Sequence, residues 1–397
     1  MSAKGAETGT DTETETETEK GADGGADGGG DARTDAGAGP GASASASASA
    51  SASASGGKKP RKNISLALQG GGSHGAFTWG VLDRLLEDEE LSIEAISGTS
   101  AGAMNAAVVT SGVARGGYEG ARADLETFWR AVSEAARFSP LQRSPIDILF
   151  GNWSLENSLA YMWLDMSAKM FSPYDLNPTG DNPLAAILTE VVDFKALNSS
   201  PAKLFITATN VETGQGRVFR NPDITVDVLL ASACLPTIYK AVEIDGVPYW
   251  DGGYTGNPSL GPLVLECGSD DTVLVQINPV RRPGVPKTSR EIANRLNEVS
   301  FNSSLMKELR MISILRKDAP EHMCEAAKWG AMRMHCIASE DMLDLDHSSK
   351  LNAEWSFMTM LRDLGREAAS TFLSRHRRDI GVRPSLDLDL FAPDYTS

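Results

Sequence analysis

The stretch Ile64-Ser65-Leu66-Ala67-Leu68-Gln69-Gly70-Gly71-Gly72-Ser73-His74-Gly75 decides the architecture of this chain. A short, mostly apolar run that ends at glycines is typical of a buried parallel strand. Beyond the glycines, apolar residues recur at the spacing of one helix face, at Phe77, Val81, Leu82 and Leu85. The stretch therefore predicts a strand, a tight turn and a helix, in that order.

The same order follows a second time. Ile93–Ser97 predicts a strand, Gly98 a turn, and the small residues of Ala101–Thr110 a helix. Two such units in succession predict a parallel α/β sheet. Later apolar runs predict strands at Lys203–Thr209, Val242–Trp250, Thr272–Ile277 and Met334–Ala338. Helical periodicity predicts helices at Ala121–Ala136, Leu155–Met170, Leu184–Val192, Val226–Cys234, Ile292–Ile312 and Trp355–Phe372.

Low-complexity sequence occupies residues 1–57: a Thr-Glu repeat, a Gly-Ala-Asp stretch and an Ala-Ser run, without a large apolar residue after Met1. Such a segment cannot offset the entropy of ordering itself, so we expect disorder. Its ten acidic and three basic residues contribute −7 to the net charge of −16. The basic linker Lys58–Lys62 predicts a solvated connection, with weak contact to anionic lipid as the alternative. The remaining moderate acidity argues against a nucleic-acid partner.

The sequence shows neither the apolar core of a signal peptide nor an apolar run near 18 residues. We therefore expect a cytoplasmic protein that meets any membrane peripherally, from solution. The four cysteines form no CxxC pair and no zinc spacing, which predicts buried free thiols in a reducing compartment and no metal site.

The pentapeptide Gly98-Thr99-Ser100-Ala101-Gly102 fits the pattern GxSxG. Between a strand and a helix, this pattern places a serine on a sharp turn, where its hydroxyl is exposed to substrate. The start of the following helix favours a developing oxyanion. We therefore expect Ser100 to be a nucleophile, with an ordinary glycine turn as the alternative.

The loop Gly70–Gly75 also fits the dinucleotide pattern GxGxxG. That interpretation needs an acidic residue at the end of the second strand, where Ser97 stands instead. A row of backbone N–H groups beside Ser100, forming an oxyanion hole, is the better hypothesis. A purely structural loop stays open as an alternative.

Asp251-Gly252-Gly253 follows the strand expected at Val242–Trp250. A serine nucleophile needs a base, which is usually histidine. None of the five histidines stands at a strand end before a glycine turn, apart from His74 inside the glycine loop itself. An aspartate held beside the serine, with water excluded, can serve directly, so Asp251 is the candidate base. The alternative is that Asp251 only forms the turn.

Together these motifs resemble the patatin-like phospholipases, lipid-acyl hydrolases with a Ser–Asp dyad. The resemblance runs from about Asn63 to Asn257, and the helical part through Arg375 is similar to the continuation in bacterial members. It implies a three-layer α/β/α fold with a mostly parallel sheet and a helical C-terminal extension. It further implies Ser100 as nucleophile, Asp251 as base, no metal, no cofactor, and an oxyanion hole from Gly71, Gly72 and Ala101. The supporting motif residues are then Gly70, His74, Gly75, Gly98, Gly102, Gly252 and Gly253.

Position 74 departs from the family pattern, which has Arg or Lys just before the last glycine of the loop. His74 supplies no permanent cation at neutral pH. This departure puts phosphate-bearing substrates in question more than ester hydrolysis itself.

The expected organisation is a disordered tail and linker (1–62), a catalytic domain (63–265), a largely helical continuation (266–385) and an unassigned end (386–397). The expected activity is hydrolysis of carboxylic esters of phospholipids or neutral lipids through an acyl-enzyme, at a membrane or lipid surface. The alternative is a catalytically silent lipid-binding or scaffold protein on the same fold.

One apolar stripe has no place in these motifs. Leu155, Leu159, Met162, Trp163, Met166 and Met170 recur at helical spacing, after Phe138, Phe150 and Trp153. Such a stripe usually belongs to the core, which is the expectation here. An acyl-chain pocket or a membrane-facing lid is the alternative, since Met and Trp suit both.

We predict that deletion of residues 2–57 leaves hydrolysis of a soluble ester and the unfolding temperature unchanged, because nothing in that segment can join a core. Both are measured on the truncated and full-length proteins. A large fall in either quantity would contradict the prediction.

Overall fold

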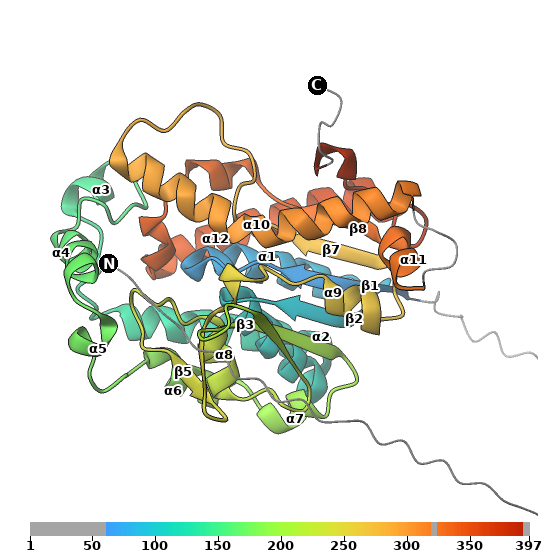
Figure 1. Ribbon diagram of the computed structural model, residues 1–397, viewed down its shortest axis with the longest axis horizontal. Coiled ribbons are helices and arrows are strands. Elements are labelled where there is room, and N and C mark those ends of the chain that lie inside the picture. Colours follow the sequence, from blue (N-terminus) through green and yellow to red (C-terminus); the bar gives the residue numbers. More distant parts are fainter. Residues whose placement is uncertain (1–60, 319–323, 392–397) are drawn as a thin grey trace, which may run out of the picture. The chain divides into compact units, whose positions relative to one another are not determined.

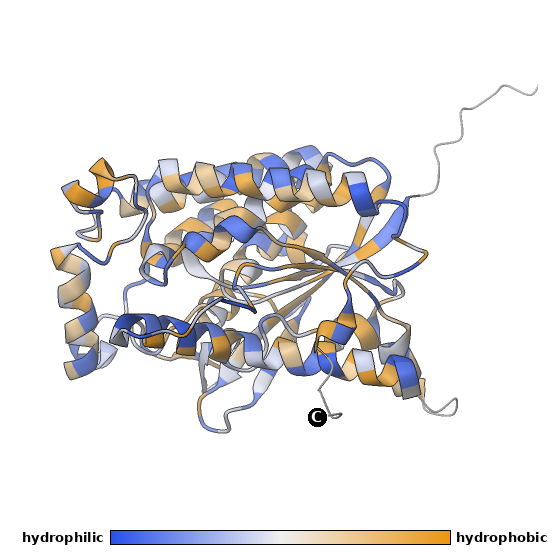
Figure 2. Cartoon of the chain, turned by 90° about the horizontal axis from the view of Figure 1, so that it is seen from above, coloured by the Kyte–Doolittle hydropathy of each residue, from blue (hydrophilic) through white to orange (hydrophobic). Residues whose placement is uncertain are grey.

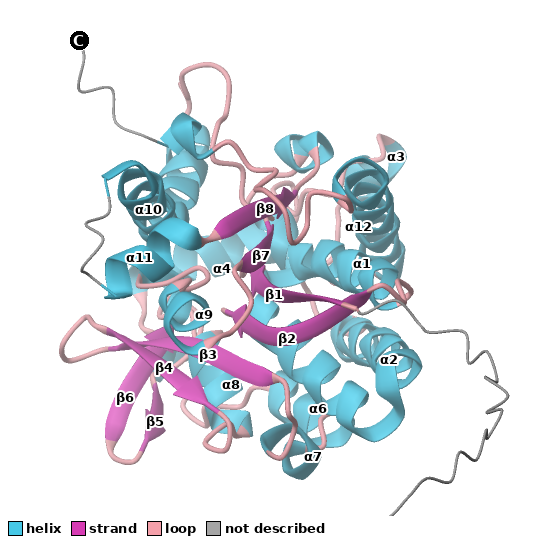
Figure 3. Cartoon of the chain, turned by 90° about the vertical axis from the view of Figure 1, so that its right-hand side faces the viewer, coloured by secondary structure: helices cyan, strands magenta, loops and turns pink. Residues whose placement is uncertain are grey.

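The computed structural model describes residues 61–318 and 324–391. The low-complexity tail, the linker residues Lys58–Pro60 and the last six residues lie outside these ranges, as does His322. Eight strands form one sheet within the described residues, in the order β5-β6-β3-β2-β1-β7-β8, with β4 also paired to β3 (Figure 3). The strands are β1 (Lys62–Leu68), β2 (Leu91–Gly98), β3 (Lys203–Asn210), β4 (Gly216–Arg220), β5 (Val242–Ile244), β6 (Val247–Asp251), β7 (Asp271–Val275) and β8 (Arg333–Ile337).

The strands at the centre of the sheet are parallel. β1 pairs in parallel with β2 and β7, β2 with β3, and β7 with β8. The antiparallel pairs are β3–β4, β3–β6 and β5–β6. The expected mostly parallel sheet is therefore confirmed, and the strands that follow residue 266 complete it beside β1.

Helices cover both faces of this sheet (Figures 1 and 3). The long helices are α1 (Gly75–Leu86), α2 (Ala101–Ala136), α4 (Leu159–Met170), α10 (Ser289–Asp318) and α12 (Trp355–His376). The shorter ones are α3 (Pro145–Leu149), α5 (Pro173–Leu176), α6 (Pro183–Val191), α7 (Phe194–Asn198), α8 (Val226–Ser232), α9 (Gly261–Glu266) and α11 (Cys324–Ala331). Single 3₁₀ turns are η1 (Gly72–His74), η2 (Gly252–Tyr254), η3 (Glu340–Asp344), η4 (Ser348–Leu351) and η5 (Leu388–Phe391).

Alternation along the strands produces two cores. Leu66 and Leu68 of β1 pack with apolar side chains of α1, α2 and α12, whereas Ala67 between them packs with those of α9 and α10. Successive side chains of a strand point to opposite faces, so one buried strand serves both layers. This arrangement is the three-layer α/β/α fold that the sequence predicts.

Several predicted elements differ in detail. The strand expected at Val242–Trp250 is a hairpin, because Asp245 and Gly246 both adopt positive φ (53° and 77°), as a two-residue turn requires. The helices expected at Ala101–Thr110 and Ala121–Ala136 run together as α2, with a kink at Gly116 and Gly117. The buried-thiol interpretation is wrong for Cys324, which is exposed.

The expectation that the apolar stripe is core is wrong for five of its six residues. Leu155 is buried, but the other five side chains, on α4, are exposed: Leu159, Met162, Trp163, Met166 and Met170. Helical periodicity gives the face on which residues gather, but not the direction in which that face points.

The crossing of α1 and α12 depends on two glycines. A Cβ on Gly80 would lie 1.9 Å from the Arg362 carbonyl oxygen, and one on Gly365 would lie 2.1 Å from that of Phe77. The backbones of α1 and α12 therefore approach more closely than a side chain at either glycine position allows.

We predict that Gly80→Ala lowers the free energy of unfolding by about 2 kcal/mol, although alanine is the better helix former, because overpacking displaces α12. Denaturant titration measures this change. Gly116→Ala is the matched control, since a Cβ there meets nothing within 4 Å. Equal stability of the two variants would disprove the role of this contact.

Candidate active site

Ser100 occupies the sharp turn between β2 and α2. Its φ of 55° and ψ of −125° lie outside the usual regions for a residue with a side chain, and it is the N-cap of α2. Its backbone N–H donates to the Oγ of buried Ser232, at 2.9 Å. The turn thus has the strained geometry that presents a serine hydroxyl outward, with α8 supporting its backbone.

The glycine loop packs directly against this turn. A Cβ on Gly70 would lie 2.7 Å from the Cβ of Ser100, and one on Gly75 would lie 2.7 Å from the Cβ of Ala101. On the other side, a Cβ on Gly102 would lie 2.3 Å from the Leu68 carbonyl oxygen. Side chains at these positions would separate the loop from the serine.

The candidate oxyanion donors stand at helix starts. Gly71 caps η1, Gly72 begins it, and Ala101 begins α2. The first N–H groups of a helix have no acceptor within the helix, so they suit an incoming oxyanion. The N–H of Gly70 is already used, since it donates to Asn257 Oδ1 at 2.7 Å.

Buried amides that the sequence analysis missed hold this loop in place. Gln69 Oε1 accepts from the backbone N–H groups of Ile277 and Asn278, both at 2.9 Å. Asn278 Nδ2 donates to the Gly70 carbonyl at 2.8 Å. Gln69 directly follows the last residue of β1, and Asn278 stands shortly after β7. In the sequence, the signal that could have identified these amides is a polar residue at the carboxyl end of a buried strand.

Asp251 ends β6, opposite Ala208 of β3. The turn that follows it is tied to β2 and its turn, because Thr99 Oγ1 donates to the Gly256 carbonyl and Ser97 Oγ to that of Ser259, both at 2.6 Å. The structure therefore brings the three glycine-bearing turns together, although the third lies about 150 residues beyond the second in sequence.

The Asp251 carboxyl is 1% exposed, and burial raises its pKa to about 7. Three groups oppose this rise: the Gly253 N–H, at 2.7 Å from Oδ1, a hydrogen bond with the Ser100 side chain, and the charge of Lys350. Asp251 can therefore accept a proton from Ser100 near neutral pH.

Lys350 brings to the glycine loop a cation that the sequence analysis missed. Its carbonyl oxygen lies against Gly72, whose φ is +58°, and its Nζ donates to Asn278 Oδ1 at 2.8 Å. Burial lowers the pKa of Lys350 to about 8, while Glu298 and Asp251 raise it. Lys350 of η4, about 275 positions beyond the loop, therefore places a cation near the glycine loop. The family pattern has its own cation in that loop, at the position where this chain has His74.

His74 itself is buried, and desolvation, with Lys350 nearby, holds its pKa well below the usual value. Its Nε2 lies 2.8 Å from Ser349 Oγ. His74 therefore carries no charge at neutral pH, and it helps to hold η4 against the loop.

None of the four histidines that the structure describes hydrogen-bonds to Ser100 or Asp251. His335 does lie between Asp271 (3.1 Å) and Ser385 (2.9 Å). Asp271, however, begins β7, whereas Ser100 follows the end of β2, so this group belongs to the opposite edge of the parallel strands. It joins β7, β8 and the chain near Ser385.

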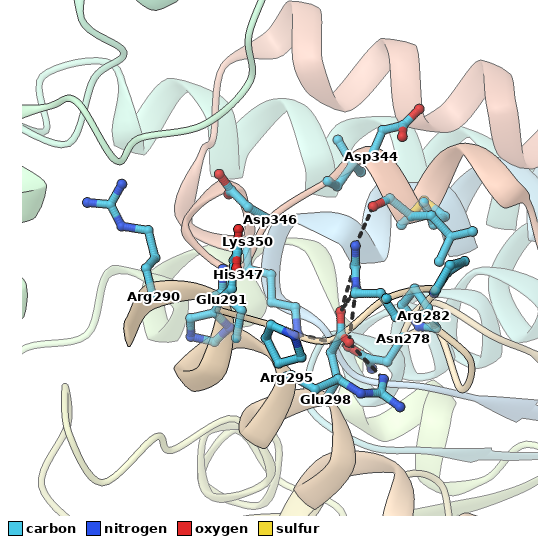
Figure 4. Close-up of a pocket in the computed structure, with 18 of the residues that line it drawn as sticks. Asn278, Arg282, Arg290, Glu291, Arg295, Glu298, Asp344, Asp346, His347 and Lys350 are labelled. Atoms are coloured by element: carbon cyan, nitrogen blue, oxygen red, sulfur yellow. Dashed lines mark hydrogen bonds and ion pairs between the residues drawn. The ribbon is translucent and has the colours of Figure 1, made fainter. Parts of the chain in front are cut away.

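A cavity of about 620 Å³ adjoins the glycine loop, and His74, Asn278 and Lys350 are among its lining residues (Figure 4). Arg282 and Arg290 also line it, paired with Glu298 (2.7 Å) and Glu156 (2.6 Å). Arg295, a third arginine in the lining, shares Glu298 with Arg282, at 3.0 Å. The cavity is therefore polar, and each of these three arginines has a carboxylate partner.

The sequence matches the family described as Patatin-like phospholipase over residues 66–264, half of the chain. The chain belongs to the patatin-like phospholipase family, and membership supports a lipid hydrolase activity. No curated protein matches the sequence. Among the described residues, no helix has the length and apolar character needed to cross a membrane.

Solved structures show partial similarity. VipD from Legionella pneumophila is 15% identical, with 77% of this chain and 67% of that chain covered and a TM-score of 0.31. The type III effector ExoU is 16% identical, with 80% and 53% covered and a TM-score of 0.30. ExoU in complex with SpcU, from Pseudomonas aeruginosa, is 18% identical, with 64% and 58% covered and a TM-score of 0.26. The chain thus spans little more than half the length of ExoU.

We predict that the rate of ester hydrolysis (kcat/KM) rises with pH through a midpoint near 7, where Asp251 loses its proton. Lys350→Met should move this midpoint to higher pH, because the lysine charge lowers the pKa of Asp251. Lys350→Arg is the control that keeps the charge. A midpoint unchanged by the methionine would show that Lys350 does not act on Asp251.

Proposed function

We propose that this protein hydrolyses carboxylic esters of lipids through an acyl-enzyme, with Ser100 as nucleophile and Asp251 as general base. The observation that carries this proposal is the contact of the Ser100 side chain with a buried carboxylate whose pKa is raised to about 7. A base is most effective when its pKa lies near the working pH. In water the same carboxyl would be too weak a base.

The first half of the reaction forms the acyl-enzyme. Asp251 accepts the proton of Ser100 as Oγ attacks the ester carbonyl, and the carbonyl oxygen becomes an oxyanion. The N–H groups of Gly71, Gly72 and Ala101 donate to that oxyanion. As the tetrahedral intermediate collapses, the bond to the leaving alcohol breaks, and the alcohol takes the proton from Asp251.

The second half releases the fatty acid. Asp251, again a carboxylate, takes a proton from water as the water oxygen attacks the acyl carbon. The bond to Ser100 Oγ then breaks, and Oγ recovers the proton. No step requires a histidine, consistent with the contacts of the described histidines.

The cavity beside the glycine loop supports a polar head group as the leaving part of the substrate. Its lining includes Lys350, whose hydrogen-bond partner is the neutral amide of Asn278. A phosphate has more to gain from this cation than from Arg282 and Arg290, which are already paired. The cavity thus has in Lys350 the cation that His74 does not supply, and we infer that phospholipids rank above neutral lipids.

We predict that Ser100→Ala and Asp251→Asn each lower ester hydrolysis by about 10⁴-fold or more, and that the double variant is scarcely worse than either. Without the serine no acyl-enzyme forms, and an amide cannot accept the proton. Released fatty acid is the measurement. An Asp251→Asn variant that stays active, beside an inactive histidine variant, would disprove the dyad.

Two controls accompany this experiment. Asp251→Asn should unfold at no lower temperature than the parent at pH 8, because burial of an amide costs less than burial of a carboxylate. A labelled fluorophosphonate should modify the parent at Ser100 but not Ser100→Ala. A parent that takes no label would favour the silent lipid-binding protein instead.

A further inference from the structure

Helix α4 has its apolar side turned outward. Leu159 is 83% exposed and Trp163 60% exposed, while Ser167, on the same helix, is buried. Helices of water-soluble proteins normally place the apolar stripe against the core and polar residues outside. Figure 2 shows strongly hydrophobic residues on the helices at the side of the molecule where Figure 1 labels α3 and α4.

Neighbouring segments extend this surface. Leu149 and Phe150, at the end of α3, are 80% and 71% exposed. Figure 1 places α3, α4 and α5 together beyond the sheet. We call the following residues the α3–α5 face: Leu149, Phe150, Leu159, Trp163, Met166, Met170 and Tyr174. Large apolar side chains that are exposed together usually mark a surface that binds lipid or another protein.

The low-complexity segment of this chain is a poor partner for the face. Residues 2–57 contain no large apolar side chain, so they have nothing with which to fill an apolar surface. The low-complexity segment is therefore not the occupant that we infer.

The α3–α5 face is joined to the candidate active site. The backbone N–H of Leu155, just before α4, donates to Ser348 Oγ at 2.9 Å, and η4 carries both Ser348 and Lys350. Glu156 lines the cavity beside the glycine loop. On the inner side of α4, burial raises the pKa of Tyr161 to about 12, and the carboxylates Asp165, Asp346 and Glu156 contribute. The segment that leads into α4 therefore contributes to the wall of the cavity.

The basic side chains near the face indicate the kind of surface. One of them, Lys240, lies over the Tyr174 ring of α5 and donates to the Pro178 carbonyl. Residues 138–176 contain only two basic side chains, and both are paired: Arg143 with Glu354 and Lys169 with Asp165, each at 2.6 Å. Anionic lipids are attracted by clusters of unpaired Lys and Arg. The face offers aromatic, Met and Leu side chains instead, which insert among head groups independently of lipid charge.

We propose that the α3–α5 face is the surface by which this protein docks onto a zwitterionic phospholipid surface, with the cavity beside the glycine loop held next to the lipid. The proposal rests on the proposed function, because the docked surface is also the source of the substrate. The proposed occupant is a lipid surface, and a second copy of this chain is an outcome of the test.

Flotation with phosphatidylcholine vesicles tests the docking. The full-length protein carries Ser100→Ala, so that the vesicles are not consumed. Adding Leu159→Gln, Trp163→Gln and Met166→Gln should lower the bound fraction at least about tenfold, from the apolar area that no longer inserts. Val382→Gln, in a residue that is 72% exposed and follows α12, is the matched control and should bind like the parent. The difference in binding between the parent and the triple variant should not grow with added phosphatidylserine or shrink at high salt, since the basic linker is common to both.

Activity assays separate this proposal from the proposed function. With Ser100 intact, the triple variant should hydrolyse a soluble short-chain ester at the parent rate but lose hydrolysis of vesicle lipid. If neither the parent nor the triple variant hydrolyses any ester, the proposed function is rejected. The flotation result would still decide whether the α3–α5 face binds lipid. Unchanged flotation of the triple variant, or binding that requires phosphatidylserine, would overturn the docking. A parent that ignores vesicles but self-associates through these residues would show a homodimer interface instead.

Discussion

The burial of the Asp251 carboxyl beside Ser100 is the constraint on which the rest of this structure depends. Loss of hydration raises the pKa of this group to about 7, against the opposing effects of the Gly253 N–H, the Ser100 side chain and Lys350. A carboxylate in that position is costly for the fold, since an unfolded chain would solvate it fully. The site therefore needs a rigid surrounding that holds the carboxyl in place, and the sheet with its three turns provides it.

That surrounding is built from backbone contacts and neutral amides. The glycine loop can lie against the serine turn only because Gly70 and Gly75 have no side chains. Gln69, Asn257 and Asn278 then fix the loop with hydrogen bonds, and they add no charge near Asp251. Lys350 is the exception, and its charge acts both on the carboxyl and on the cavity.

Element η4 links the parts of the molecule that the proposals join. Lys350 lies against Gly72, Ser349 contacts His74, and Ser348 accepts from the N–H of Leu155 before α4. One short turn therefore contacts the glycine loop and the segment that carries the exposed apolar stripe. The helix proposed to meet the lipid surface is thus linked, through the segment before it, to the glycine loop.

The sequence by itself determined the fold class, the strand–turn–helix units around Gly70–Gly75 and Ser100, and the family, because each depends on local periodicity and on motifs a few residues long. It also pointed to Asp251, through a glycine turn after an apolar run. Only the tertiary structure decided that Lys350 stands where His74 leaves a cation missing, because that contact joins residues about 275 positions apart. It also decided that the stripe of α4 faces outward: periodicity records which side chains share a face, but the direction of that face depends on what the rest of the chain leaves uncovered.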